Sequence, residues 1–371
     1  MLKSIALLSV LALDMYELKI DEVLDFVRKK GARRLLLQFA NGLKQNSCSV
    51  VEELSRELPS VEVLVSGSSC YGACDVAFEE AVRVGADTIV HYGHTPFPEA
   101  FTHANKLGVG VFFVEAFSRT ELLFKAVDRA LDVLRSMENV ANVGITASLQ
   151  EVPYIEPIKQ RLEREGFWAH VGTGSKRVKY AGQVLGCDYT SALSIRDKVE
   201  GFVHLGGGLF HALGLGLATQ SPVVLCDPYR GEAQDIGHVV RKVKATRLYY
   251  VTQAMEEAKR YCIVIGCKWR QRHLHSAMKV KGLLEKKGKK VYLLTLHEVS
   301  PQALENFPEP DAFVITACPR IPIDDYMNYR RPVLTVLEAL IVAGELKLEE
   351  WSLCDWKLNE KATRDVAFEG K

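Results

Sequence analysis

The chain has 371 residues, of which 48% are hydrophobic and 25% charged, with 47 Lys and Arg against 46 Asp and Glu. This length allows two or three hydrophobic cores rather than one, and the composition is that of a soluble globular protein. The even balance of charge argues against a nucleic-acid or membrane partner recognised through net charge.

Nine cysteines are scattered along the chain, an odd number without the density of a disulfide framework. In a chain of this size the pattern indicates a reducing compartment, so we predict a cytoplasmic protein. In that compartment a cysteine serves as a small buried hydrophobe, a ligand or a nucleophile.

Residues 1–14 contain an apolar run over 5–13 that is too short to span a bilayer. Lys3 precedes the run, but no small-x-small cleavage site follows it. We interpret residues 1–14 as a dispensable extension, with a signal peptide as the alternative, and expect no membrane partner.

Apolar strands alternate with amphipathic helices along the rest of the chain. The first set of expected strands covers 33–39, 61–65, 86–94 and 109–114, with a closing helix over 120–137. The second set covers 142–146, 168–171, 200–205 and 223–227, and a largely helical stretch follows over 232–259. The third covers 261–266, 290–296 and 311–316, with a last strand and helix over 332–343. Unbroken apolar strands separated by helices indicate parallel sheets buried on both faces.

The pattern therefore predicts an α/β protein of three structurally repeated, small, parallel-sheet (Rossmann-like) domains arranged around a pseudo-threefold axis. We expect the domains to cover residues 15–139 with Cys74, 140–258 with Cys187, and 259–371 with Cys318.

Each of these three cysteines lies in a Gly- or Pro-containing loop after a strand. Three thiolates brought together would ligate three irons of a [4Fe-4S] cluster and leave the fourth iron open for a substrate. Three unrelated buried cysteines are the alternative, and position alone does not exclude it. Cys70 is interpreted as a packed turn thiol or a spare ligand, and the roles of Cys70 and Cys267 stay open. A zinc site is disfavoured because Cys262 and Cys267 have no matching pair nearby.

Three motifs carry a resemblance to a known family. They are Tyr71-Gly72-Ala73-Cys74-Asp75, Gly186-Cys187, and the run from Ala317-Cys318-Pro319-Arg320 to Asp324-Asp325. Together they resemble the archaeal diphthamide synthase family of non-conventional radical S-adenosylmethionine (SAM) enzymes. Landmarks at 207–211 and 227–229 match as well, so the resemblance covers roughly residues 30–340. It implies that Cys74, Cys187 and Cys318 hold the cluster.

The resemblance implies a transferase, a 2-(3-amino-3-carboxypropyl)histidine synthase. One electron from the cluster breaks the bond between the SAM sulfonium and the methionine γ-carbon. The resulting 3-amino-3-carboxypropyl radical adds to C2 of a histidine of elongation factor 2, the first step of diphthamide biosynthesis. An electron donor and a homodimer are implied too, and no nucleic acid is expected.

The expected SAM-binding residues are Gly206, Gly207, Gly208, His211, Asp227, Tyr229 and Arg320. Glycines let a backbone approach a ligand, and a helix N-terminus favours a carboxylate. Each has a structural alternative: a plain tight turn for the glycines, a helix cap for His211, an Asp-Pro turn for Asp227, and a pairing with Asp324 or Asp325 for Arg320.

Lys268, Arg270 and Arg272 are interpreted as a solvated loop or as a docking patch for the protein substrate. Two other functions stay open. One is a [4Fe-4S] dehydratase like quinolinate synthase, against which the 318–325 run argues. The other is a non-catalytic iron-sulfur or ligand-binding protein.

Overall fold

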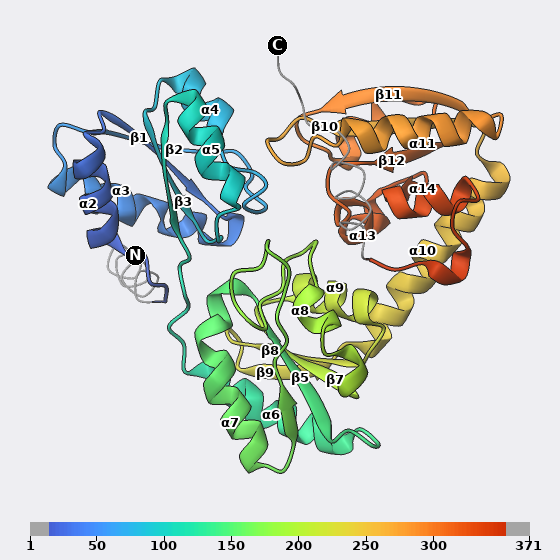
Figure 1. The fold of residues 1–371 in the computed structure, drawn as a ribbon, viewed down its shortest axis with the longest axis horizontal. Helices are drawn as coiled ribbons and strands as arrows, with labels where there is room; N and C mark the ends of the chain where they lie inside the picture. Colours follow the sequence, from blue (N-terminus) through green and yellow to red (C-terminus); the bar gives the residue numbers. More distant parts are fainter. Residues whose placement is uncertain (1–14, 354–371) are drawn as a thin grey trace, which may run out of the picture.

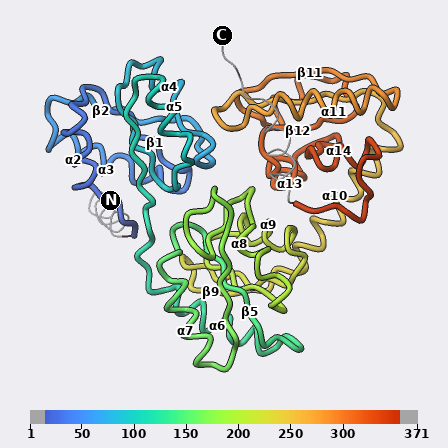
Figure 2. The backbone as a smooth tube through the Cα atoms, viewed as in Figure 1, coloured from blue at the N-terminus to red at the C-terminus, as the bar shows by residue number. Residues whose placement is uncertain are grey.

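The computed structural model describes residues 15–353. Figure 1 shows three α/β units at the corners of a triangle, each built on its own sheet. The tube in Figure 2 passes from the first unit to the second through an extended segment after β4 (Gly110–Val114), and from the second to the third along α10 (Gly237–Glu257).

The first sheet has the strand order β2-β1-β3-β4, with all neighbours parallel. Its other strands are β1 (Arg34–Phe39), β2 (Glu62–Val65) and β3 (Thr88–Tyr92). Leu35 and Leu37 of β1 pack with α2 (Ile20–Lys30) and α3 (Ser47–Glu57). Leu36, on the opposite face, packs with α4 (Phe78–Val84) and α5 (Pro98–Leu107). Both faces of β1 are covered, which explains its apolar run Leu35–Leu37.

The second sheet has the order β6-β5-β7-β8-β9. Its strands are β5 (Asn142–Ala147), β6 (Trp168–His170), β7 (Gly201–Leu205), β8 (Val223–Asp227) and β9 (Glu232–Asp235). Val203 and Leu205 pack with α6 (Leu122–Ser136) and α7 (Ile155–Arg164). Phe202 faces the other core, which contains α8 (Thr190–Leu193), α9 (Leu209–Thr219) and α10.

One expectation about this unit is wrong. The helix expected over 120–137 to close the first unit is α6, and its buried face packs against the second sheet instead. The stretch 232–259 is largely helical, as expected, because α10 covers Gly237–Glu257, while residues 232–235 form β9, antiparallel to β8. Local periodicity predicts a helix but not the sheet on which it packs.

The third sheet has the order β11-β10-β12-β13, again parallel. Its strands are β10 (Arg260–Gly266), β11 (Lys290–Leu296), β12 (Ala312–Ile315) and β13 (Val333–Leu334). Its helices are α11 (Leu274–Lys286), α12 (Pro301–Glu305), α13 (Ile321–Asp324) and α14 (Val336–Val342). Short 3-10 helices complete the chain: Asn41–Asn46, Leu149–Tyr154, Arg196–Lys198, Tyr326–Asn328 and Leu348–Glu350.

The three sheets share one strand order, in which the second and third strands of each unit flank the first and the fourth lies beyond the third. The second sheet adds β9 at its edge. The pseudo-threefold axis stays a prediction, as do the domain bounds 15–139, 140–258 and 259–371, of which 354–371 lie outside the described residues.

A buried ion pair ties α10 to α14. The Arg247 guanidinium donates to both carboxylate oxygens of Glu338 and to the carbonyls of Pro322 and Val333, and neither side chain is exposed. Glu338 also belongs to the capping box of α14, because the Thr335 hydroxyl accepts from its amide and its carboxylate accepts from the Thr335 amide. This pair fixes the third unit on the linking helix.

Within residues 15–353, none of the helices combines the length and apolar character needed to cross a bilayer.

Candidate metal centre

Cys74 lies in the turn between β2 and α4. The Asp75 amide closes the turn by donating to the Gly72 carbonyl at 2.9 Å. Two groups of the third unit reach it: the Arg270 amide donates to the Cys74 carbonyl at 3.0 Å, and the Gln271 side-chain amide donates to its Sγ at 3.6 Å. The first and third units are therefore joined at this cysteine.

Cys187 lies between β6 and α8, in a turn where the backbones of Leu185 and Asp188 pair. The Arg177 guanidinium donates to the Cys187 Sγ at 3.3 Å. Arg177 Nε is buried without a hydrogen-bond partner among the described residues. The guanidinium is therefore placed to balance negative charge on this sulfur.

Cys318 follows β12 and precedes α13, and its carbonyl accepts from the Ile321 amide at 3.2 Å. Burial raises the pKa of the Cys318 thiol, and the nearby Cys187 and Cys74 raise it further. Burial and then Cys187 likewise raise the pKa of Cys74 to about 12.

The three cysteine loops converge from three units. The Cys74 turn accepts from Arg270 and Gln271 of the third unit, and Arg320, two residues after Cys318, donates to the hydroxyl of Tyr189, two residues after Cys187. In line with this, Cys187 contributes to the raised pKa of both Cys74 and Cys318. Crowded, buried thiols resist ionisation, and the positive charge of a bound metal centre is what allows three thiolates side by side. Three sulfurs with an adjacent guanidinium fit three irons of a [4Fe-4S] cluster. The assignment of these residues as ligands stays a prediction.

The three cysteine loops are not equivalent in topology. Cys74 follows β2 and Cys187 follows β6, the strands that hold the same place in their sheets. Cys318 instead follows β12, which corresponds to β3 and β7, while Cys267 follows the central strand β10. The third sulfur thus reaches the centre from a different strand.

The turn Gly206–Gly208 joins β7 to α9, as expected. A Cβ at Gly207 would lie 2.4 Å from the Tyr229 ring, so only glycine allows this close approach. Gly208 has a φ of +69°, which favours glycine by itself. The turn is therefore required by packing, and its contact with a ligand stays a prediction.

His211, on the first turn of α9, contacts the second sheet through Ser148. Its Nδ1 lies 3.1 Å from the Ser148 Oγ, which lies 3.4 Å from Nε2 of the buried His204. Burial lowers the pKa of His211 to about 3, with further contributions from Arg320 and from His94 of the first unit. His211 therefore stays neutral, and it lies near residues of all three units.

Asp227 and Tyr229 form a separate group. The Asp227 carboxylate accepts from the backbone amides of Tyr229 and Arg230 at 2.9 and 3.2 Å, the Asp-Pro turn considered above. The Tyr229 hydroxyl donates to Glu151 at 3.3 Å and accepts from Tyr16 at 2.8 Å. Burial raises the pKa of Glu151 to about 8.

Arg320 is paired with Asp324, the structural alternative named above. Its guanidinium donates to both carboxylate oxygens of Asp324 at 3.0 and 2.6 Å and to the Tyr189 hydroxyl at 2.9 Å. It also covers the Phe210 ring at 4.1 Å and is 2% exposed. Arg320 thus contributes its positive charge to the site while three of its five N–H donors are held by Asp324 and Tyr189.

The interpretation of Lys268 as part of a solvated loop or docking patch is wrong. Lys268 is buried, and its ammonium lies 2.8 Å from Asp75, 2.9 Å from Glu298 and 4.7 Å from the centre of the Tyr71 ring. Arg270 is near Glu99 of the first unit at 3.5 Å. The loop therefore packs on the Cys74 turn.

Sequence reasoning missed Arg177 and Gln271, which contact two of the three sulfurs. Neither residue lies in a motif, and Gln271 is 197 positions from Cys74. The contact of Arg177 appears only when the loop of the second unit is folded, and that of Gln271 only when the first and third units meet.

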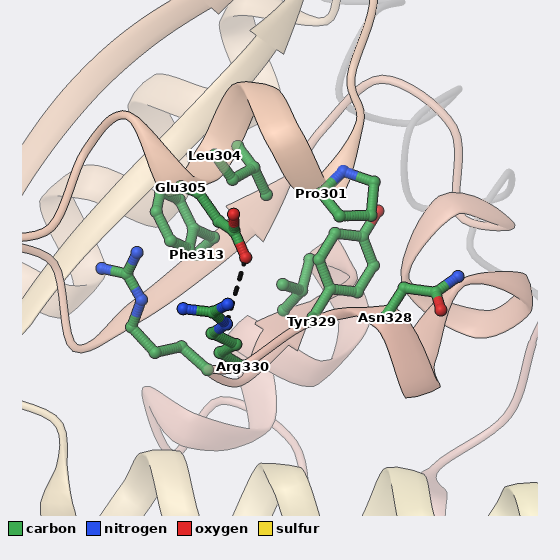
Figure 3. Close-up of a pocket in the computed structure, with 9 residues that line it drawn as sticks. Pro301, Leu304, Glu305, Phe313, Asn328, Tyr329 and Arg330 are labelled. Carbon is green, nitrogen blue, oxygen red and sulfur yellow. Dashed lines mark ion pairs between the residues drawn. The ribbon is translucent and has the colours of Figure 1, made fainter.

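A surface hollow on the third unit does not belong to the centre (Figure 3). It is lined by residues of α12, β12 and the 326–333 segment, where Arg330 pairs with Glu305 at 3.2 Å. Its internal volume of about 20 Å³ holds about one water molecule. None of the predicted site residues lines it.

Comparisons with known proteins give matches over most of the chain. The family model described as "Putative diphthamide synthesis protein" matches residues 39–356. The 2-(3-amino-3-carboxypropyl)histidine synthase of Pyrococcus horikoshii is 34% identical over 334 residues, covering 89% of this chain and 91% of that protein. Subunit 1 of the human enzyme of the same name is 28% identical over 343 residues, covering 90% of this chain and 74% of that protein.

A solved structure also matches most of the chain. The crystal structure titled Dph2 from Pyrococcus horikoshii with 4Fe-4S cluster superimposes with a TM-score of 0.78 and 31% identity, covering 91% of this chain and 94% of that one. The family model and these relatives cover nearly all of the described residues. This chain therefore belongs to the diphthamide synthesis protein family.

Proposed function

We propose that this protein is a 2-(3-amino-3-carboxypropyl)histidine synthase. It transfers the 3-amino-3-carboxypropyl group of SAM to a histidine of elongation factor 2, the first step of diphthamide biosynthesis. The convergence of Cys74, Cys187 and Cys318 carries the proposal. The relatives of this name, which match about nine-tenths of the chain, support it.

The three cysteines would hold the cluster, which when bound supplies the single electron that cleaves the Cγ–S bond of SAM with departure of methylthioadenosine. Arg177 and Gln271 donate to two of the sulfurs, and such hydrogen bonds and charges tune the reduction potential of iron-sulfur centres. The protein's share of the work is to position SAM and exclude water.

For SAM we propose two contact regions. The first is the turn Gly206–Gly208 with His211, where free amides of the α9 N-terminus favour the methionine carboxylate. The second is Asp227 with Tyr229, which packs directly against Gly207 and would bind the ribose. Arg320 would act mainly through its charge, because Asp324 and Tyr189 hold its guanidinium in place with three hydrogen bonds.

The reacting imidazole belongs to the protein substrate, so no internal catalytic histidine is required. We further propose three domains around a pseudo-threefold axis, a homodimer, an external electron donor and a cytoplasmic location. For the homodimer, the mass of the full chain in solution is the direct measurement.

The reaction is tested by incubating the anaerobically reconstituted protein with SAM, dithionite and elongation factor 2. We expect methylthioadenosine and a gain in mass on elongation factor 2 at its target histidine. Formation of quinolinate from iminoaspartate and dihydroxyacetone phosphate would instead support the dehydratase. A reconstituted, cluster-containing protein that makes neither product would support a binding protein.

A further inference from the structure

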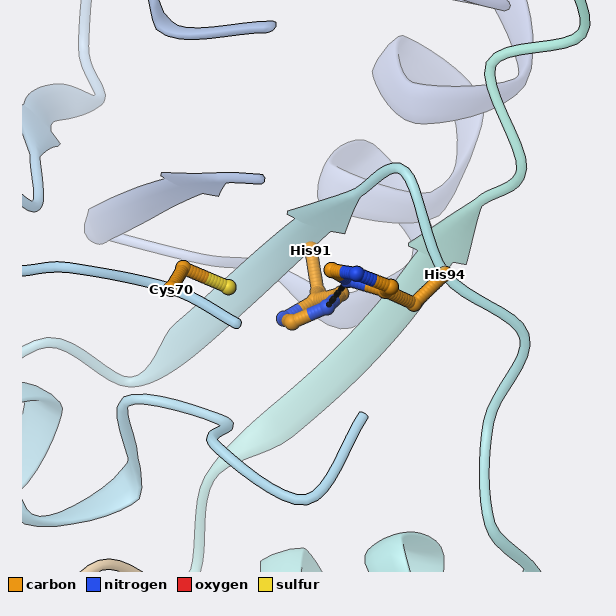
Figure 4. A group of neighbouring side chains, drawn as sticks. All are labelled: Cys70, His91 and His94. Atoms are coloured by element: carbon orange, nitrogen blue, oxygen red, sulfur yellow. Dashed lines mark hydrogen bonds between the residues drawn. The ribbon is translucent and has the colours of Figure 1, made fainter. Parts of the chain in front are cut away.

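Cys70, His91 and His94 gather at the carboxyl edge of the first sheet (Figure 4). One donor atom of each lies within 4.8 Å of those of the other two. His91 Nε2 faces His94 Nδ1 at 2.9 Å. Cys70 is 2% exposed and His91 is fully buried. None of these three belongs to the three-cysteine centre, and the reaction proposed above requires none of them.

Gln38 fixes the orientation and tautomer of His91. Its side-chain nitrogen donates to the Asp75 carbonyl at 2.7 Å, and its side-chain oxygen accepts from the Ala77 amide at 2.9 Å, so the amide cannot be reversed. That oxygen lies 2.8 Å from His91 Nδ1, which must therefore carry the proton. Nε2 is left with its lone pair aimed at His94. Metal-ligating histidines are commonly held in this way by a carbonyl oxygen on the other ring nitrogen.

The sheet itself brings these groups together. Gln38 and His91 are paired residues of the adjacent parallel strands β1 and β3. Asn41, just past the end of β1, anchors Cys70 through two hydrogen bonds. The side-chain oxygen of Asn41 accepts from the Cys70 backbone amide at 3.1 Å, and the backbone amide of Asn41 donates to the Cys70 carbonyl at 3.3 Å. His91 lies on β3 itself, and Cys70 and His94, in the loops after β2 and β3, are held beside it by these hydrogen bonds.

We propose that Cys70, His91 and His94 form a second metal site, separate from the three-cysteine centre, for one divalent transition-metal ion of the Zn²⁺ or Co²⁺ type. One thiolate and two imidazoles suit such borderline ions, and three protein ligands leave a fourth position for water. On binding, Cys70 loses its thiol proton to solvent and His94 shifts its ring proton from Nδ1 to Nε2. One proton is therefore released per ion bound.

Co²⁺ is the probe, because its thiolate charge-transfer band and the intensified d–d bands of a tetrahedral site report the ligands directly. The full chain carrying Cys74→Ser, Cys187→Ser and Cys318→Ser is titrated anaerobically, so that the three-cysteine centre cannot take the ion. We expect one Co²⁺ per chain with a sulfur-to-metal band. Adding Cys70→Ser should abolish that band, and adding His94→Gln should weaken binding about 10- to 100-fold.

The matched control is Cys48→Ser, which removes an exposed thiol on α3 and should leave the spectrum unchanged. Gln38→Met should weaken Co²⁺ binding about 10- to 100-fold while every ligand is retained. A folded parent variant, judged by circular dichroism, that shows no sulfur-to-cobalt band overturns the proposal, as does a band that survives Cys70→Ser. Either result leaves the iron content and product formation of the wild-type protein, and so the proposed function, untouched.

Discussion

Residues with the same chemistry have different roles here, according to their neighbours. Cys74 and Cys318 lie near Cys187 and its guanidinium partner, whereas Cys226 and Cys262 are core hydrophobes. Cys70 is only four positions from Cys74, yet its thiol lies beside the side chains of His91 and His94. Neighbours in space, rather than proximity in sequence, decide what each sulfur can hold.

We expect Cys74→Ala, Cys187→Ala and Cys318→Ala each to abolish stable cluster assembly, because a single missing thiolate leaves one iron unligated. Cys70→Ala should retain the cluster, and Cys48→Ala serves as an exposed control. Iron and sulfide per chain after anaerobic reconstitution measure the outcome. Equal loss in Cys70→Ala would overturn the choice of ligands.

Removing the charge of Arg177 should make the cluster harder to reduce, because the guanidinium stabilises added negative charge. For Arg177→Gln we expect a reduction potential more negative by on the order of 60 mV, which corresponds to about 1.4 kcal/mol for one electron. Arg177→Lys, which keeps the positive charge, should show a smaller fall in reduction potential. Redox titration of the reconstituted variants measures it, and an unchanged potential in Arg177→Gln would refute this role.

Glu151 should make stability depend on pH. Its pKa is raised to about 8 by burial, so the folded protein holds a proton that the unfolded chain releases near pH 4.5. Its contribution to stability is complete below pH 4.5 and is lost as pH rises through 8. The free energy of unfolding of Glu151→Gln, taken relative to that of the wild type, should therefore rise by about a few kcal/mol from pH 5 to pH 8. Urea unfolding of both proteins at both pH values measures this. A difference between variant and wild type that is the same at pH 5 and pH 8 would contradict it.

At the scale of elements, α10 and α14 are joined by the Arg247–Glu338 pair, which lies inside the core shared by the second and third units. Breaking a buried pair leaves an uncompensated charge, so we expect Glu338→Ala to destabilise the protein by about 3–5 kcal/mol. The exposed pair Lys159–Glu163 on α7 is the control, and Lys159→Ala should cost about 0.5 kcal/mol or less. Denaturant unfolding measures the loss in free energy of unfolding for both variants. Similar losses would show that the buried pair stabilises the protein no more than the exposed one.

At the scale of the whole molecule, the first and third units meet at the Cys74 turn, where Lys268 of the third unit pairs with Asp75 of the first. Lys268→Met should loosen that turn and lower iron retention several-fold, because Asp75 would lose its buried cation. The exposed Arg272→Met is the control. Amide exchange over residues 70–78 measures the loosening, and wild-type protection in Lys268→Met would argue against this role.

The succession of strands and helices along the chain, the parallel sheets and the one-cysteine-per-unit pattern follow from the sequence, because apolar periodicity and loop residues are local properties. The three motifs and their spacing also identify the family. The packing of α6 on the second sheet, the burial of Lys268 and the pairing of Arg320 with Asp324 depend on contacts that are distant or compete in energy. Arg177 at Cys187 and the group of Cys70 with two histidines emerge only once the loops of one unit are folded, and Gln271 at Cys74 only once the first and third units are assembled. A chain pattern specifies which face is buried, but only tertiary packing decides which charges and sulfurs meet there.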